Sequence, residues 1–208
     1  MTAASLVFVI DDDPSVRSSL KFLLSTVGLQ AETFESVDSF LRRKAPDIPC
    51  CLVLDVRLPG LSGLDFQREL ATRHNCIPIV FLTGHGDIPM SVRAMKAGAV
   101  EFLTKPFRDQ DLLDAVRVAL DRDRARRKHD KEATDLRQRF DSLTSREQEV
   151  VSMVVAGMLN KQIAAELGTA ESTVKVQRSR GMEKMQAASL AELIKMIEKV
   201  KAPSEKAS

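Results

Sequence analysis

Leu6-Val7-Phe8-Val9-Ile10 runs directly into Asp11-Asp12-Asp13 near the start of the chain. A run of five apolar residues bounded by polar ones is typical of a fully buried β-strand. Buried strands of this kind belong to parallel sheets that carry helices on both faces. The three acidic residues would then stand at the carboxyl end of the first strand.

Apolar runs and helical patterns alternate over the first 120 residues. We predict strands at 6–10, 31–34, 50–54, 77–82 and 100–103, and helices at 16–27, 37–43, 64–73, 89–97 and from 109 onward. Because the connections are short, this alternation predicts parallel βαβ units. The fold class we expect for this half is α/β, a doubly wound five-stranded parallel sheet.

Polar residues follow the predicted strands at the edge where sheets of this class bind ligands. Asp55 follows the third strand, Thr83 the fourth and Lys105 the fifth. Capping of the next helix would explain one or two of the acids Asp11, Asp12 and Asp13, but it does not explain Asp55 after an apolar strand. Carboxylates gathered at one edge repel each other unless a cation joins them, which indicates a site for Mg²⁺ or Mn²⁺.

This set of groups suits phosphoryl transfer. A carboxylate can attack phosphorus and become an acyl phosphate, and positive charge and hydrogen-bond donors then stabilise the phosphoryl oxygens. Lys105 supplies the charge and Thr83 a hydroxyl. The chain contains no Gly-x-x-x-x-Gly-Lys-Ser/Thr loop, which excludes a P-loop nucleotidase.

The second half of the chain differs in charge and pattern. Residues 1–121 carry 13 Lys and Arg against 16 Asp and Glu, whereas residues 122–208 carry 18 against 13. A basic balance favours a polyanionic partner, although ordinary solvated surfaces show it as well. Residues 121–139 contain eight basic and five acidic residues without Gly or Pro, so we expect an exposed helix there; a flexible linker is the alternative.

Residues 140–200 carry only helical signals. We expect helices at 145–156, 160–167, 171–185 and 189–200, with a capping box at Thr144 and Glu147 and a cap at Asn160. A short helix, a Gly-containing turn and a second helix form a helix-turn-helix pattern. Residues 201–208 are expected to be a frayed tail.

Composition excludes several classes of protein. No apolar run approaches the roughly 18 residues of a membrane span, and the first residues lack the order of a signal peptide. The three cysteines form no Cys-x-x-Cys pair, which argues against a disulfide framework and a zinc site. We expect a cytoplasmic protein that does not bind membranes.

Four segments of the first half resemble the receiver domain of two-component response regulators of the FixJ type. They are Val9-Ile10-Asp11-Asp12-Asp13, Leu54-Asp55-Val56-Arg57-Leu58-Pro59-Gly60, Leu82-Thr83-Gly84-His85-Gly86-Asp87 and Lys105-Pro106-Phe107. The resemblance covers about residues 5–120 and implies a flavodoxin-like receiver domain at residues 1–120, which the charged helical linker expected at 121–139 would follow.

The resemblance also implies a role for each matching residue. Asp55 would be the phosphoacceptor, and Asp11, Asp12, Asp55 and the backbone carbonyl of Arg57 would hold the metal ion. Thr83 and Lys105 would sense the phosphoryl group. Phe102 matches the aromatic switch position, and the bond between Lys105 and Pro106 is expected to be cis.

Segments of the second half resemble the LuxR/FixJ-type helix-turn-helix domain, over residues 140–200. They are residues 143–150, Gly157, residues 160–164, Leu167-Gly168 and residues 172–178. The third helix of the domain would enter the major groove of DNA. Base edges would be contacted by Ser172, Lys175, Val176 and Ser179, which share one helix face; phosphates would be contacted by Lys161, Thr173, Arg178 and Arg180. Ala170 stands where the family usually has Ser or Thr, and Gln177 stands where it commonly has His.

We therefore interpret the chain as a bacterial transcriptional response regulator and not an enzyme. Its expected partners are a sensor histidine kinase, double-stranded promoter DNA and, when phosphorylated, a second copy, with RNA polymerase as a candidate further partner. The apolar residues Ile88, Met90, Val92 and Met95 are expected to form the dimer interface.

Two alternatives stay open at this point. A haloacid-dehalogenase-like phosphatase would use Asp11 as its nucleophile and Asp13 as its acid. A response regulator whose helical domain acts only through protein contacts would not bind DNA.

Overall fold

The computed structural model describes residues 4–44, 46–73, 75–84 and 88–201. The chain divides into two compact units, residues 1–127 and 128–208. In the described part, no helix combines the length and the hydropathy that crossing a bilayer requires.

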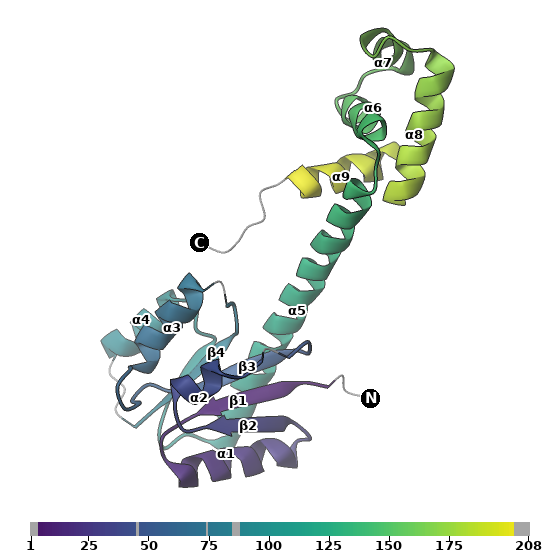
Figure 1. Cartoon of the computed structure of the whole chain (residues 1–208). Helices are drawn as coiled ribbons and strands as arrows, with labels where there is room; N and C mark the ends of the chain where they lie inside the picture. The colour runs from purple at the N-terminus through teal and green to yellow at the C-terminus, as the bar shows by residue number, and fades with distance from the viewer. Residues whose placement is uncertain (1–3, 45, 74, 85–87, 202–208) are drawn as a thin grey trace. The chain divides into compact units, whose positions relative to one another are not determined.

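The first unit is a parallel α/β sandwich (Figure 1). Its elements are β1 (Leu6–Ile10), α1 (Pro14–Thr26), β2 (Gln30–Phe34), α2 (Val37–Leu41), β3 (Cys50–Asp55), α3 (Gly63–Thr72), β4 (Ile79–Thr83), α4 (Ile88–Lys96), β5 (Glu101–Thr104) and the first part of α5 (Asp109–Asp141). The strand order is β2-β1-β3-β4-β5, and every neighbouring pair is parallel. The predicted fold class is confirmed.

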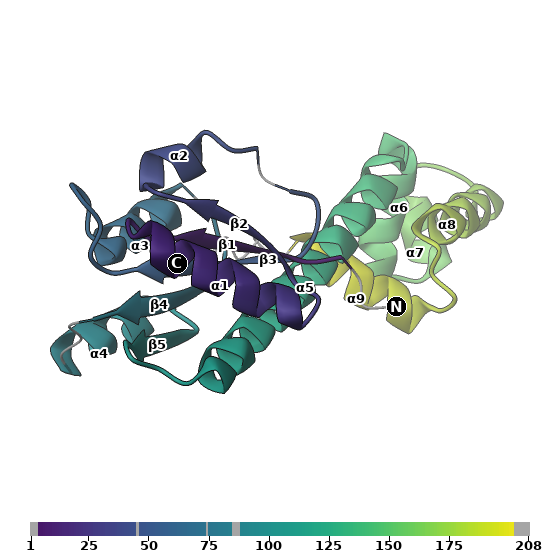
Figure 2. The same ribbon diagram turned by 90° about the horizontal axis from the view of Figure 1, so that it is seen from below.

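Two apolar cores lie on opposite faces of this sheet, because successive side chains of a strand point to opposite sides. Phe8, Leu52 and Phe81 pack on the side of α2, α3 and α4. Val7 and Val53 pack on the other side, against α1 and α5, which Figure 2 shows from below. With both faces covered, the central strands have no polar side, and this explains their uninterrupted apolar runs.

The ends of several elements differ from the prediction by one or two residues. The fourth strand was expected from Ile77, yet β4 begins at Ile79. Pro78 has no N–H to donate to the strand ladder, and only its carbonyl takes part, accepting from Leu52 N–H at 2.9 Å. The sheet also includes Asp55 and Thr83 as the last residues of β3 and β4.

The second unit consists of helices around its own core. It contains the rest of α5, then α6 (Ser145–Val155), α7 (Asn160–Glu166), α8 (Glu171–Met185) and α9 (Leu190–Lys201). Val150, Ile163, Val174 and Leu193 are fully buried between them. No strand occurs in the described residues of this unit, as the sequence predicts.

The caps of α6 and α7 test two sequence predictions. The capping box of α6 is confirmed: Thr144 N–H donates to Glu147, and Glu147 N–H donates to Thr144 Oγ1. The cap expected at Asn160 is wrong. Leu159 occupies the cap position, with its N–H donating to Gln162 Oε1 at 2.8 Å, and Asn160 is the first helical residue. Gln162, at the third helical position, accepts from the N–H of the cap residue, as the corresponding residue of a capping box does.

Helix α5 runs from Asp109 to Asp141 without a break and includes the charged segment 121–139. The division between the two units falls within this helix, after Arg127. Residues 128–134 are all exposed. The domain boundaries predicted from the sequence, at 120 and 139, stay predictions, and residues 202–208 of the expected tail lie outside the described residues.

Candidate functional site

Three carboxylates meet at the carboxyl end of the sheet. Asp11 follows β1, Asp55 ends β3, and Ile10 is paired with Leu54 in the register of these neighbouring strands. Ligand oxygens of Asp11, Asp12 and Asp55 all lie within 4.8 Å of one another. Asp11 is 1% exposed and Asp55 7%, whereas Asp12 faces solvent. The arrangement predicted from strand order is therefore present.

Lys105 reaches into this group from the segment after β5. Its Nζ lies 2.7 Å from Asp11 Oδ2 and 2.7 Å from Asp55 Oδ2. The peptide bond between Lys105 and Pro106 is cis, as expected. Lys105 N–H donates to the carbonyl of Thr83 at 2.7 Å, which ties the lysine to the end of β4.

Burial and hydrogen bonding shift the pKa values of Lys105 and Asp11. Burial lowers the pKa of Lys105, but its hydrogen bonds to Asp11 and Asp55 outweigh that effect and leave the pKa raised. For Asp11, burial raises the pKa more than the hydrogen bonds from Lys105 and from Asp13 N–H lower it. A second positive charge at Asp11 would relieve this cost. Carboxylates around a partly open position are the donors Mg²⁺ prefers, so these residues fit a divalent cation.

Backbone groups hold Asp55 in place. Arg57 N–H donates to Asp55 Oδ1 at 2.8 Å, so each carboxylate oxygen of Asp55 has a donor. The start of α3 closes the other side, where Gly63 N–H donates to the carbonyl of Val56 at 2.9 Å. This contact of the Arg57 N–H with Asp55 is additional to the role that the resemblance implies for Arg57, which involves only its carbonyl.

Asp13 has a different role from its two neighbours. Its Oδ1 accepts from Ser15 N–H at 2.7 Å and caps α1, and this bond lowers the pKa of Asp13. A capping carboxylate with a lowered pKa is a poor proton donor, which weighs against the phosphatase alternative.

Arg17 was missed in the sequence. Its Nη1 donates to the carbonyls of Asp11 and Asp12 at 2.7 and 3.0 Å. It therefore fixes the backbone on which two of the carboxylates stand. Its position one turn into the helix that follows the acidic run was the available signal.

Thr83 and Phe102 lie on adjacent strands. Thr83 is completely buried at the end of β4. Phe102 is half-buried on β5, where it is paired in register with Phe81, and the two ring centroids are 6.2 Å apart. The loop residues His85, Gly86 and Asp87 of the quoted motif lie outside the described residues.

The expected dimer face on α4 is only partly exposed. Ile88 is 80% exposed, Val92 44% and Met95 43%. Met90 differs from the prediction: it is half-buried and packs against the core under α4. Three of the four apolar residues thus remain at the surface.

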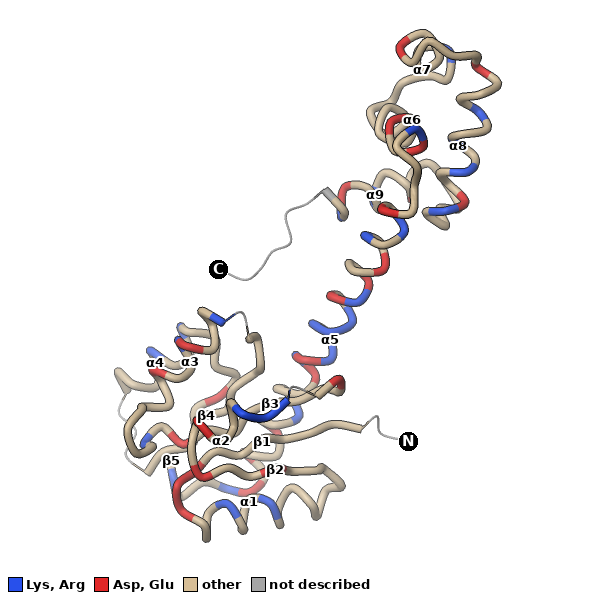
Figure 3. Tube along the Cα trace, in the orientation of Figure 1, with Lys and Arg blue, Asp and Glu red and all other residues tan. Residues whose placement is uncertain are grey.

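Most of the predicted DNA contacts are exposed on the helical unit. They are Lys161 on α7 and Ser172, Thr173, Lys175, Val176, Ser179 and Arg180 on α8. Figure 3 shows the basic residues spaced along α8. Arg178 is half-buried, with Nη1 3.4 Å from Asn160 Oδ1, and Lys175 Nζ lies 3.3 Å from Glu171 Oε1.

Contacts from α6 hold α8 in position. Val174 on α8 is completely buried, and Lys184 Nζ lies 2.6 Å from Glu147 Oε2, which lowers the pKa of Glu147. A β-carbon on Gly181 would stand 2.7 Å from a methyl group of Val151, so the two helices approach closely at this glycine. At the other end, Ala170 provides no side-chain cap.

Known proteins match both units. A family model for the response regulator receiver domain matches residues 7–117, and one for bacterial regulatory proteins of the luxR family matches residues 141–197. The chain is 57% identical over 194 residues to nodulation protein W of Bradyrhizobium diazoefficiens, covering 93% of this chain and 86% of that protein. It is 45% identical to response regulator protein TodT of Pseudomonas putida, covering 95% and 87%.

A solved structure matches as well. The low-resolution structure of response regulator StyR has a TM-score of 0.87 and 51% identity, and the match covers 95% of this chain and 100% of that chain.

The chain belongs to the two-component response regulators.

As a response regulator it joins a receiver domain to a LuxR-type DNA-binding domain, and its relatives are transcriptional response regulators. The family regulates transcription and is not a family of enzymes. Its domain pair implies a kinase and DNA as partners, and receiver domains typically bind Mg²⁺ at an acidic pocket such as the one found here.

Proposed function

We propose that a sensor histidine kinase phosphorylates Asp55 in the cytoplasm, and that phosphorylation controls dimerisation and promoter binding. The observation that carries the proposal is the position of Lys105 Nζ, 2.7 Å from both Asp55 and Asp11, at an edge where three carboxylates gather. This grouping brings a nucleophile, a cation site and a fixed positive charge together.

The chemical step forms one bond and breaks one. An oxygen of Asp55 attacks phosphorus, and the bond from phosphorus to the kinase's histidine nitrogen breaks, leaving its electron pair on that nitrogen. Asp55 Oδ2 now accepts from Lys105, so Lys105 must turn to the phosphoryl oxygens as the new bond forms. The raised pKa of Lys105 keeps it charged for this contact.

Asp11, Asp12, Asp55 and the backbone carbonyl of Arg57 would hold Mg²⁺ or Mn²⁺. When bound, the divalent cation offsets the negative charge of the carboxylates and of the incoming phosphoryl group. The raised pKa of Asp11 supports this assignment, because a buried carboxylate with too few positive partners favours a cation beside it.

The signal would leave the site through Thr83 and Phe102. The Thr83 hydroxyl turns to a phosphoryl oxygen, and Phe102 moves into the space that becomes free. That movement reshapes the surface of α4 and β5, where Ile88, Val92 and Met95 are exposed, and a second copy then binds there. The alternative is a constitutive dimer in which Phe102 is an ordinary core residue.

The LuxR-type domain would place α8 in the major groove of promoter DNA. Ser172, Lys175, Val176 and Ser179 would contact base edges, and Lys161, Thr173, Arg178 and Arg180 phosphates. Arg178 supports this least directly, because part of it is engaged with Asn160. RNA polymerase is a further candidate partner of the DNA-bound protein.

Phosphorylation of the parent and of Asp55→Asn tests the proposal. The parent should take up about one phosphate per chain from a small phosphodonor, only with Mg²⁺ or Mn²⁺ present, and should then protect a specific promoter site more strongly. Asp55→Asn should do neither, whereas Asp65→Asn, a control at an exposed acid on α3, should behave as the parent. Undiminished labelling of Asp55→Asn, or phosphate on Asp11, would show that the phosphoacceptor is wrongly assigned.

A further inference from the structure

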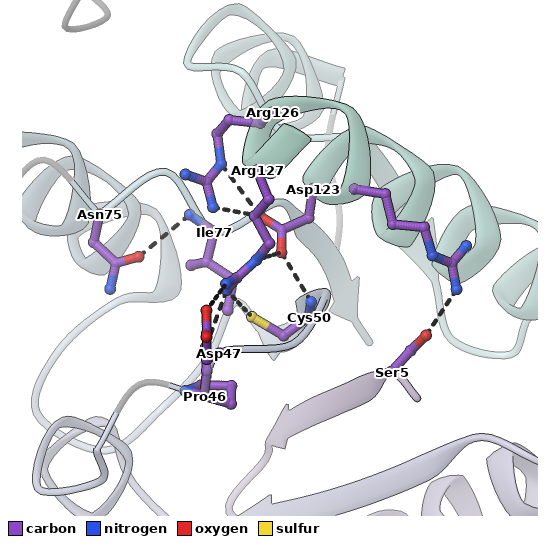
Figure 4. A network of polar contacts seen from close by, with 10 residues as sticks. Ser5, Pro46, Asp47, Cys50, Asn75, Ile77, Asp123, Arg126 and Arg127 are labelled. Atoms are coloured by element: carbon purple, nitrogen blue, oxygen red, sulfur yellow. Dashed lines mark hydrogen bonds and ion pairs between the residues drawn. The ribbon is translucent and has the colours of Figure 1, made fainter. Parts of the chain in front are cut away.

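A second charged cluster lies beside Cys50, which begins β3, whereas Asp55 ends that strand. Figure 4 shows the cluster. Asp123, on α5, is completely buried. Its Oδ2 accepts from the backbone N–H of Cys50 at 2.9 Å and from Arg127 Nε at 2.6 Å, and its Oδ1 accepts from Arg126 Nη2 at 2.5 Å. We call Asp123, Arg126 and Arg127 the α5 clamp.

The clamp also holds the segment that leads into β3. Arg127 Nη2 donates to the carbonyl of Pro46 at 3.2 Å, and Arg127 Nη1 lies 3.8 Å from Asp47 Oδ1. Next to the clamp, Arg124 Nη2 donates to Ser5 Oγ at 2.7 Å, before β1. The same turns of α5 are thus attached to the beginnings of two adjacent strands.

Holding a helix with a buried ionic group costs free energy, because the group loses its hydration. Earlier turns of α5 use Val116 and Leu120, both buried in the apolar core. A buried carboxylate costs free energy that is recovered only with good geometry, and apolar residues of similar volume often stabilise as well or better. What directional bonds provide is a single defined position of the helix, because a shift of α5 by one residue would break them all.

The clamp stands between the phosphorylation site and an exposed stretch of helix. All six residues of β3, from Cys50 to Asp55, are buried. Asp55 ends this strand, and Cys50, which begins it, is the residue bonded to Asp123. Residues 128–134, which follow the clamp on α5, are all exposed.

We propose that Asp123 is a positioning residue for signalling: it holds α5 in one place on β3, so that the change at Asp55 reaches the DNA-binding domain along the helix. The inference rests on the proposed function. Without the clamp, α5 would shift on the sheet, and phosphorylation would no longer change DNA affinity to the same extent. The clamp takes no part in accepting the phosphoryl group.

The test compares DNA affinity with and without phosphorylation in the full chain. Asp123→Asn keeps an oxygen for Cys50 N–H but loses its charge, and the partly exposed Arg126 and Arg127 can then be hydrated. Arg127→Gln serves as a second variant in case the first does not fold. Asp121→Asn is the matched control, because Asp121 is an exposed acid on the same helix, paired with Arg124.

Coupling between sites in one protein typically changes affinity about 5- to 150-fold. We expect the parent and Asp121→Asn to show an increase in this range on phosphorylation. Asp123→Asn and Arg127→Gln should take up phosphate at the parental rate, yet show an increase of about twofold or less. Amide hydrogen exchange of residues 121–127 should be faster in both variants.

The possible results test the role of the clamp and the proposed function separately. If a clamp variant unfolds more easily but keeps the parental increase in DNA affinity, the clamp is merely structural and this inference is wrong. The same holds if the variants lose phosphate uptake along with the response. If the parent itself takes up phosphate without any gain in DNA affinity, the proposed function fails, and the inference fails with it.

Discussion

At Gly63 the backbone of α3 comes so close to the backbone of Asp55 and Val56 that side-chain size becomes critical. A β-carbon there would stand 2.5 Å from the carbonyl oxygen of Asp55 and 3.1 Å from the Cα of Val56. Both neighbours are backbone atoms of the segment that carries the candidate phosphoacceptor, so they cannot rotate away.

We therefore predict that Gly63→Ala slows labelling of Asp55 and lowers the free energy of unfolding by about 1–3 kcal/mol, because the backbone must shift. Labelling rates and urea unfolding measure the two effects. Gly84→Ala is a control for stability, since a β-carbon at Gly84 would meet nothing within 4 Å. Parental values for both quantities in Gly63→Ala would contradict the prediction.

The lowered pKa of Asp123 predicts that the stability of the protein depends on pH. Burial acts to raise its pKa, but the hydrogen bonds from Arg127, Cys50 N–H and Arg126 outweigh burial, and the pKa lies below its ordinary value of 3.8. The carboxylate therefore contributes stability that is fully present above about pH 3.8 and disappears as pH falls through the lower folded-state value.

The difference in unfolding free energy between the parent and Asp123→Asn should consequently be constant near neutral pH and shrink in acid. Denaturant unfolding at a series of pH values between 7 and 3 measures it. A difference that grows as the pH falls would mean that the pKa of Asp123 is raised in the folded protein.

Sequence reasoning succeeded for residues whose position follows from strand order. Asp11, Asp55, Thr83 and Lys105 each come at the end of a parallel strand, and such ends gather at one edge of the sheet. It failed for Asp123, whose hydrogen-bond partner Cys50 lies 73 residues earlier in the sequence. In the sequence, Asp123 is one more acid in a charged helix, and no local pattern distinguishes a buried partner from a solvated one.

The ends of helices and strands are also hard to predict from local sequence patterns. The types and order of the elements follow from apolar periodicity, whereas their ends depend on single hydrogen bonds. Leu159 takes the cap position expected for Asn160, with its N–H bonded to Gln162, and Pro78 delays the start of β4. The sequence did mark one such end correctly, at Ala170, where a usual cap is absent.

Helix α8 should be stabilised by restoring that cap. Ala170 has the extended conformation of a cap residue, with φ −75° and ψ 147°, but no side-chain oxygen. Ala170→Ser should raise the free energy of unfolding of the helical unit by about 0.5–2 kcal/mol, because the hydroxyl accepts from an unpaired N–H of the first turn. Thermal unfolding measures the gain, and Ala170→Val, which adds bulk without an acceptor, should show none.

At the scale of the whole molecule, the proposed mechanism gives Thr83 a role after phosphorylation and none in phosphate uptake itself. The proposed mechanism needs its hydroxyl after the phosphoryl group has arrived and not before. Thr83→Ala should accept phosphate at Asp55 yet remain a monomer, whereas the phosphorylated parent should double its mass in analytical ultracentrifugation.

Thr104→Ala is the matched control, because Thr104 lies beside Thr83 in the strand register but is exposed. It should dimerise as the parent does. If the parent has the same mass with and without phosphate and binds DNA equally well in both states, the dimerisation mechanism is ruled out.

The uninterrupted helix α5 also limits how regulators of this design can vary in length. Each residue inserted among the exposed positions 128–134 turns everything that follows by about 100° and advances it by about 1.5 Å. Seven added residues bring the rotation back to within about 20° of its starting phase and lengthen the helix by about 10 Å, whereas two or five turn the rest of the helix by about 200° or 140°. A change of length in this stretch of α5 is therefore also a change of helical phase.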